Sequence, residues 1–211
     1  LSADTPSSIS KSVGLGIISF ADTLEELQPD IVVLFGDRFE MLAAAIASNF
    51  AKIPIAHMMG GESTVGSFDE SIRHSITKMS FWHFVATKQY RKRVIQLGEN
   101  PNRVFMVGGM GVDRIMRTNL LKKKELGNAI NFTLGRKNLL VTFHPVTLGK
   151  DSSREQFNEL LLALDSLIET NIIFTYPNAD TDGRIINSMI DDFVTKHADN
   201  AIGFISMGHR N

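Results

Sequence analysis

Two short apolar runs, each ending in a glycine turn, constrain the fold of this chain most strongly. Residues 31–35 read IVVLF and stop at Gly36, and residues 53–57 are followed by Gly60 and Gly61. Runs of this length suit strands that are buried in a parallel sheet. Between them, apolar residues recur at helical spacing over residues 39–50. A strand, a helix and a strand in this order predict a parallel α/β unit.

Ionisable residues follow both predicted strands at the same edge of the sheet. Asp37 and Arg38 come directly after the first strand, His57 ends the second, and Glu62 follows its glycine turn. Ligands bind in open α/β sheets outside the carboxyl ends of the strands. These side chains are therefore expected to face one crevice.

A helix start is predicted next to this crevice. Ser67 and Glu70 form the S-x-x-E pattern of a capping box, in which the two side chains bond each other's backbone N–H groups. This interpretation places Asp69 in the first turn of the helix and Arg73 and His74 one turn later.

The same alternation continues to the end of the chain and predicts two domains. The polar stretch 118–137 is the expected boundary, so the domains are 1–118, without a first strand, and 119–211, which has too few strands to close its core and is incomplete. The fold class is thus α/β, with two Rossmann-like, doubly wound parallel sheets. The other expected elements are helices 13–28, 87–97, 112 onward, 154–170 and 185–197, and strands 82–86, 103–107, 139–143, 171–176 and 201–205.

Composition excludes several classes of function. The 211 residues carry a formal net charge of −1, which gives no general attraction for nucleic acid or for an anionic membrane surface. No apolar run is long enough to cross a membrane, no signal peptide opens the chain, and the absence of cysteine removes disulfides and thiol nucleophiles. A cytoplasmic enzyme fits these features. The basic cluster Lys88, Arg91, Lys92 and Arg93 is interpreted as a solvated helix face rather than a phosphate site.

Five sequence blocks resemble one enzyme family. They are G-D-R-F-E at 36–40, H-M-M-G-G-E at 57–62, F-D-E-S-I-R-H-S-I-T-K-M at 68–79, F-V-A-T at 84–87 and T-F-H-P-V-T at 142–147. Their order and spacing are similar to those of the hydrolysing UDP-N-acetylglucosamine 2-epimerases of sialic acid and related nonulosonate biosynthesis. The resemblance implies a glycosyltransferase-B arrangement that binds a UDP-sugar between two domains, no cofactor, and assembly as a homodimer or homotetramer.

The implied reaction requires a well-placed base. In this family a base removes the proton from the sugar carbon that bears the acetamido group, UDP leaves the anomeric carbon, and water adds to the resulting glycal. The resemblance makes Asp69 the base and Asp37 the group for a second proton transfer, with Glu62 facing the substrate. The structural alternatives are that Asp69 helps to cap its helix and pairs with Arg73, and that Glu62 only shapes a turn.

The resemblance also implies binding residues. Arg38 and Asn178 match residues that contact the nucleotide. His144 matches a histidine that faces UDP across the cleft, and it is expected among the catalytic residues. Arg73 and His74 are expected to contact substrate, although His74 could instead form a structural pair with Glu70 four residues earlier. The remaining histidines have no paired ligand spacing, so no metal site is expected.

One position departs from the family pattern and several alternatives stay open. Met59 stands where the family usually has glutamate or histidine, which points to a different sugar, such as a 2,4-diacetamido-trideoxy hexose, or to weaker activity. A non-hydrolysing epimerase is the nearest alternative, but the H-V-E-A-G-L-R-T block of that group is absent. A glycosyltransferase of the same architecture and an inactive fragment that only binds a second copy are further alternatives.

Overall fold

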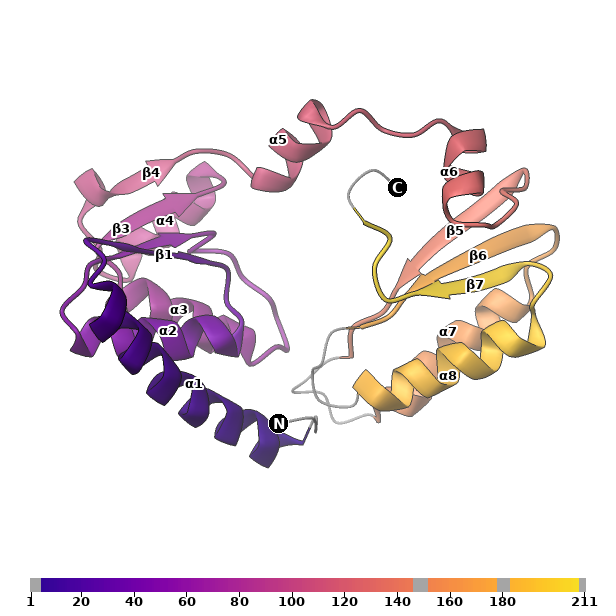
Figure 1. Ribbon diagram of the computed structural model, residues 1–211. Helices are drawn as coiled ribbons and strands as arrows, with labels where there is room; N and C mark the ends of the chain where they lie inside the picture. The colour runs from indigo at the N-terminus through magenta and orange to yellow at the C-terminus, as the bar shows by residue number, and fades with distance from the viewer. Residues whose placement is uncertain (1–4, 146–151, 178–182, 209–211) are drawn as a thin grey trace. The chain divides into compact units, whose positions relative to one another are not determined.

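The chain consists of two compact α/β units, each built on its own parallel sheet (Figure 1). The computed structural model describes residues 5–145, 152–177 and 183–208. The first unit spans Leu1–Asp113 and the second Arg114–Asn211. The predicted α/β class with parallel sheets is confirmed, and the domain limits drawn from the sequence stay a prediction.

The first unit has the strand order β1-β2-β3-β4, which is also the order of these strands in the chain. Each strand pairs in parallel with the next. Its elements are α1 (Pro6–Leu27), β1 (Val32–Phe35), α2 (Phe39–Phe50), β2 (Ile55–Met58), α3 (Asp69–Met79), β3 (Trp82–Val85), α4 (Lys88–Gln96), a 3-10 turn (Pro101–Arg103) and β4 (Val104–Met106), followed by α5 (Met110–Arg117) at the junction of the units.

One face of this sheet is covered by helices and the other is largely open. The register aligns Leu34, His57, His83 and Val104 in one buried row, against which α2, α3 and α4 pack. The neighbouring row on the opposite face runs Phe35–Met58–Phe84–Phe105, and its two end residues are 47% and 43% exposed. The buried face therefore holds the core of the unit, and it contains His57 and His83 among its apolar residues. The expectation that His57 faces the crevice is wrong, because its position in β2 points its side chain to the helix-covered face of the sheet.

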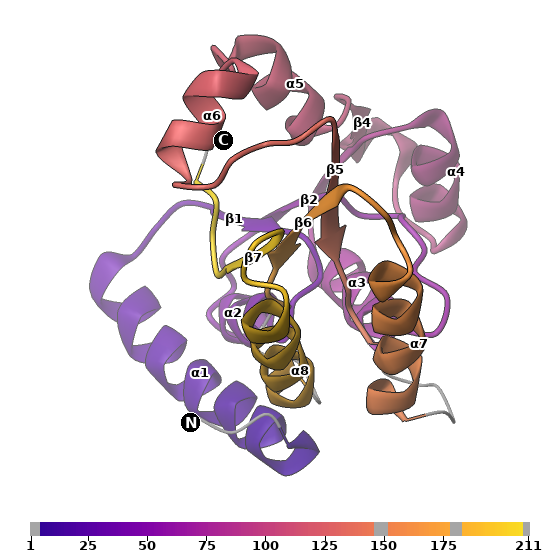
Figure 2. The same ribbon diagram turned by 90° about the vertical axis from the view of Figure 1, so that its right-hand side faces the viewer.

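The second unit repeats the arrangement with three strands in the order β5-β6-β7. In Figures 1 and 2, α7 and α8 lie along the same face of this sheet. Phe157 and Phe174 are fully buried between these layers, and the Phe174 ring lies edge-on to Phe193 at 5.5 Å between centroids. The elements are α6 (Lys123–Ala129), β5 (Lys137–Thr142), α7 (Ser153–Asp165), β6 (Thr170–Thr175), α8 (Gly183–Lys196) and β7 (Ala201–Phe204).

Two helix predictions were wrong in their limits, and one helix was not predicted. Helix α1 begins at Pro6 rather than near residue 13, because Thr5 caps it by accepting a hydrogen bond from the Ser8 N–H at 3.2 Å. Helix α6 lies inside the stretch predicted to be irregular. Helix α7 ends at Asp165, so Ile168, which was expected on its buried side, is 78% exposed in the connection to β6. In the described part of the chain, no helix is long and apolar enough to span a bilayer.

Candidate active site

The site is built at the carboxyl ends of the adjacent strands β1 and β2. Gly36 ends β1 with a left-handed φ of +84°, which lets the chain turn sharply and present Asp37 at the sheet edge. Beyond β2, Gly61 adopts a φ of +79° and is followed directly by Glu62. The sequence prediction that both carboxylates follow strand exits is confirmed.

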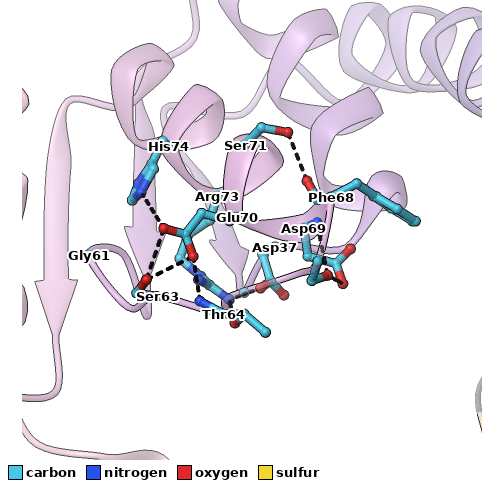
Figure 3. A network of polar contacts seen from close by, with 12 residues as sticks. Asp37, Gly61, Ser63, Thr64, Phe68, Asp69, Glu70, Ser71, Arg73 and His74 are labelled. Atoms are coloured by element: carbon cyan, nitrogen blue, oxygen red, sulfur yellow. Dashed lines mark hydrogen bonds and ion pairs between the residues drawn. The ribbon is translucent and has the colours of Figure 1, made fainter. Parts of the chain in front are cut away.

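Arg73 of α3 reaches across to the β1 exit. Its Nη2 donates to the carboxylate of Asp37 and also to the hydroxyl of Thr64, at 3.0 Å (Figure 3). The arginine is only 5% exposed, and its buried Nη1 has no hydrogen-bond partner among the described residues. A charge-assisted pair of this kind is strong and directional. It ties the start of α3 to the β1 exit and keeps a positive charge beside the carboxylates.

Glu62 is half-buried beside this pair. Burial raises the pKa of its carboxyl group, and the nearby negative charge of Asp37 acts in the same direction, whereas the positive charge of Arg73 partly opposes them. A carboxyl with a raised pKa exchanges its proton more readily near neutral pH than an ordinary glutamate does. Glu62 therefore has the electrostatic character of an acid–base group.

Asp69 is the first residue of α3, as expected for a carboxylate at a helix start. Its Oδ2 accepts a hydrogen bond from the Ser67 hydroxyl at 2.8 Å, and its backbone N–H donates to the same hydroxyl oxygen at 3.1 Å. The negative charge lies at the positive end of the helix dipole, which favours its ionised form. The side chain is half-buried, so it combines a fixed orientation with access to the surface.

The predicted capping box between Ser67 and Glu70 is wrong. The residue before the helix is Phe68, whose side chain makes no capping hydrogen bond. The Glu70 carboxylate instead turns back to the preceding loop, where it accepts hydrogen bonds from the Ser63 hydroxyl and the Thr64 N–H (Figure 3). These bonds lower the pKa of Glu70. Glu70 thus closes the loop that carries Thr64, the second partner of Arg73.

His74 and Arg38 both contact near neighbours in the sequence. His74 Nε2 lies 3.6 Å from the Glu70 carboxylate, which is the structural pairing named as its alternative role. Arg38 Nε lies 3.5 Å from Glu40, and its guanidinium lies over the Phe39 ring at 5.2 Å from the centroid. The substrate-binding roles of His74 and Arg38 stay predictions.

The two remaining expected residues belong to the second unit. His144 follows β5 at its carboxyl end and is exposed. Asn178 lies outside the described residues. In the described part of the chain, no group of three histidine, aspartate or glutamate side chains is arranged to hold a metal ion.

The basic cluster on α4 supports the site in a way that the sequence interpretation missed. Arg93 donates to the Gly61 carbonyl, immediately before Glu62, and Arg91 donates to the carbonyls of Val104 at 3.0 Å and Pro101 at 2.9 Å. The interpretation as a solvated face is therefore wrong for these two arginines, although Lys88 and Lys92 are exposed. No feature of the basic run itself indicated that backbone carbonyls would be its partners.

The chain resembles known proteins over nearly its whole length. A family model described as UDP-N-acetylglucosamine 2-epimerase matches residues 1–209 of this chain. The chain belongs to this family. A GDP/UDP-N,N'-diacetylbacillosamine 2-epimerase (hydrolyzing) of Campylobacter jejuni is 41% identical over 208 residues, which are 99% of this chain and 54% of the relative. A UDP-N,N'-diacetylbacillosamine 2-epimerase (hydrolyzing) of Legionella pneumophila is 38% identical over 89% of this chain and 49% of the relative.

Solved structures show the same fold. The UDP-GlcNAc 2-epimerase of Methanocaldococcus jannaschii, determined in complex with UDP-GlcNAc and UDP, matches with a TM-score of 0.72 and 22% identity, over 93% of this chain and 55% of that protein. The chain thus spans about half the length of the curated relatives and of the structure that it matches. The predicted membership of the epimerase family and the predicted epimerase fold are confirmed.

Proposed function

We propose that the protein to which this chain belongs converts a UDP-linked 2-acetamido sugar into the free 2-epimer and UDP, by elimination to a glycal and hydration. One observation carries the proposal. Asp37 follows β1, Glu62 follows β2 and Asp69 begins α3, all within one α/β unit. Arg73 of α3 binds the carboxylate of Asp37. The hydrolysing relatives at 41% and 38% identity support the hydrolysing reaction over the non-hydrolysing alternative.

Each carboxylate suits a different part of this reaction. Asp69 takes the proton from the carbon bearing the acetamido group, since it begins α3 beside the other carboxylates of the unit and Ser67 fixes its orientation. The second proton transfer, which the resemblance assigned to Asp37, is proposed for Glu62 instead, because its raised pKa lets it hold a proton and release it. Asp37, paired with Arg73, orients the substrate, and Arg38, His144 and Asn178 are proposed to hold the UDP group.

The sugar is proposed to carry acetamido groups at two positions. The two hydrolysing relatives are named for N,N'-diacetylbacillosamine, and Met59 stands at the exit of β2 with an apolar side chain that suits a deoxygenated sugar. UDP-GlcNAc is the alternative substrate. A place in sialic acid or related nonulosonate synthesis, a cytoplasmic location, and assembly as a homodimer or homotetramer belong to the same proposal.

The test is to incubate the purified protein with UDP-N,N'-diacetylbacillosamine and, separately, with UDP-GlcNAc in deuterated water. Equal amounts of free 2-epimer and UDP are expected, with one deuterium at the epimerised carbon. A UDP-linked epimer without free sugar would establish the non-hydrolysing reaction instead, and a requirement for an acceptor would indicate a glycosyltransferase.

Asp69→Asn provides the negative control for turnover, because the amide keeps the shape of the side chain but cannot take a proton. Asp165→Asn is its matched control. Asp165 ends α7 in the second unit, is 41% exposed at its side chain, and pairs with Lys196 and His197. Turnover should be lost in the first variant and kept in the second, and full activity of Asp69→Asn would refute its role as the base.

A further inference from the structure

His57 is fully buried beneath the site and touches two of its segments directly. Its Nε2 lies 2.8 Å from the carbonyl oxygen of Gly36, the residue before Asp37. Its Nδ1 lies 3.2 Å from the hydroxyl of Thr77, one helical turn after Arg73 on α3. One imidazole ring therefore connects the exit of β1 to the helix that supplies the arginine.

The hydrogen-bond roles of the ring follow from its partners. A carbonyl oxygen can only accept, so Nε2 carries the proton and donates to Gly36. Burial lowers the pKa of His57 to about 4, so the ring is neutral near pH 7, and Nδ1 carries no proton and can only accept a hydrogen bond. The Thr77 hydroxyl lies within hydrogen-bond distance of both Nδ1 and the Arg73 carbonyl, at 3.2 and 2.9 Å. Its single proton serves one of them at a time.

The third segment packs directly on this pair of side chains. A Cβ atom added to Gly60 would lie 3.2 Å from His57 Nδ1 and 3.2 Å from Thr77 Oγ1, closer than most real contacts of a Cβ. The backbone two residues before Glu62 therefore lies directly against the side chains of His57 and Thr77. A larger residue at position 60 would push this loop away from the pair.

We propose that His57 is a positioning residue that sets the relative placement of Asp37, Glu62 and Arg73 through the three segments that contact its ring. The proposal rests on the proposed function for its effect on turnover. The ring does not need to touch substrate or move a proton. It acts by fixing the β1 exit, the glycine turn after β2 and the third turn of α3 to one another.

The neighbouring strand offers a matched control. His83 is paired with His57 in the register of β2 and β3 and is equally buried, but its Nε2 faces Glu99 at 3.2 Å, after α4. Replacing His83 removes a buried imidazole from the same face of the same sheet, without removing a hydrogen bond to the Gly36 or Thr77 segments. A generic cost of changing a buried histidine should therefore appear equally in both sets of variants.

The experiment compares His57→Gln, His57→Asn and Thr77→Val with His83→Gln and His83→Asn in the purified protein. Glutamine places an amide donor where Nε2 lies and can keep the bond to Gly36, whereas asparagine is too short to reach it. We expect kcat to fall about 100-fold in His57→Asn and less than about tenfold in His57→Gln, with KM within about threefold, since small misplacements of reacting groups cost turnover rather than binding. The kcat of Thr77→Val should lie between those of His57→Asn and His57→Gln.

The decisive comparison is between the two asparagine variants. An equal loss of kcat in His57→Asn and His83→Asn would overturn the proposal, because it would show only the general cost of a buried vacancy. Equal kcat in His57→Gln and His57→Asn would overturn the role of the Gly36 bond. If His57→Asn does not fold, Thr77→Val against the two His83 variants decides the same question.

A measurement without turnover separates this proposal from the proposed function. Carbon-13 NMR of the side-chain carboxyl groups follows the titration of Glu62 directly. His57→Asn should return the pKa of Glu62 toward its ordinary value as the loop loosens, and His83→Asn should leave it unchanged. If the wild-type protein turns over no UDP-sugar, the proposed function fails and this titration alone decides; an unchanged Glu62 pKa in His57→Asn would then overturn the positioning role.

Discussion

Replacing Gly61 with alanine should destabilise the first unit by about 3 kcal/mol. The residue has a φ of +79°, where a side chain costs roughly 1–2 kcal/mol. The new Cβ would also lie 2.4 Å from the Tyr90 carbonyl oxygen and 2.9 Å from Val94 Cγ2. Because the first of these atoms belongs to the backbone of α4, the helix and the loop must separate, and such overpacking costs about 1–3 kcal/mol.

Two other glycines separate these contributions. Gly36 has a φ of +84° but nothing within 4 Å of an added Cβ, so Gly36→Ala should cost only the backbone part, about 1–2 kcal/mol. Gly109 has neither a left-handed φ nor a close neighbour, so Gly109→Ala should change stability by less than about 0.5 kcal/mol.

The assay is urea unfolding followed by tryptophan fluorescence. The chain has a single tryptophan, Trp82 in β3, so the signal reports the first unit. For a unit of this size, 3 kcal/mol corresponds to a fall in Tm of about 10 °C, which gives a second measurement. Equal free energies of unfolding for Gly61→Ala and Gly36→Ala would refute the inferred collision with α4.

Three further predictions concern the charged residues of the site. Arg73→Met should lower the free energy of unfolding by about 2–4 kcal/mol in the same assay, because it leaves Asp37 without its buried partner, and a loss below 0.5 kcal/mol would contradict this. Glu62→Gln should stabilise the protein relative to wild type at pH 7 and have no effect below the ordinary glutamate pKa of 4.5. The reason is that the raised pKa of Glu62 in the folded state favours its protonated form, so the stability that the protonated carboxyl contributes is lost as the pH rises. Urea midpoints of both proteins across pH 3.5–8 test this. A difference between them that does not change with pH would count against it. Glu70→Ala should make thermolysin cleave the loop that contains Ser63 and Thr64 faster, because the carboxylate no longer holds this loop to α3. Glu159→Ala on α7 is the control. Identical digestion patterns of the two variants would show that the carboxylate does not hold the loop.

The strand exits could be predicted because the sequence marks them locally. An unbroken apolar run followed by glycine fixes both the end of a strand and the place of the next side chain, so Asp37 and Glu62 were found at the expected edge. The capping of α4 by Thr87, which accepts from the Tyr90 N–H at 3.2 Å, follows the same kind of local rule. Such signals depend on neighbours within four residues.

The partners within the site could not be predicted in this way. Arg73 was weighed as a partner of Asp69 four residues away, but the structure pairs it with Asp37, which is 36 residues distant. The S-x-x-E pattern was equally compatible with a capping box and with the loop contacts that Glu70 makes, because the competing donors lie outside the four-residue motif. The support given by His57 depends on three segments that meet only after folding.

The identical order of the strands in the chain and in each sheet also affects how the protein is made. Because β1 to β4 are adjacent in sequence order, each newly synthesised strand can pair with the strand that left the ribosome just before it. The first unit can thus be completed from neighbouring segments during translation. Because a domain of this size folds as one cooperative unit, ribosome-bound chains that end after β2 or β3 should stay sensitive to protease, and resistance should appear once β4 has left the ribosome.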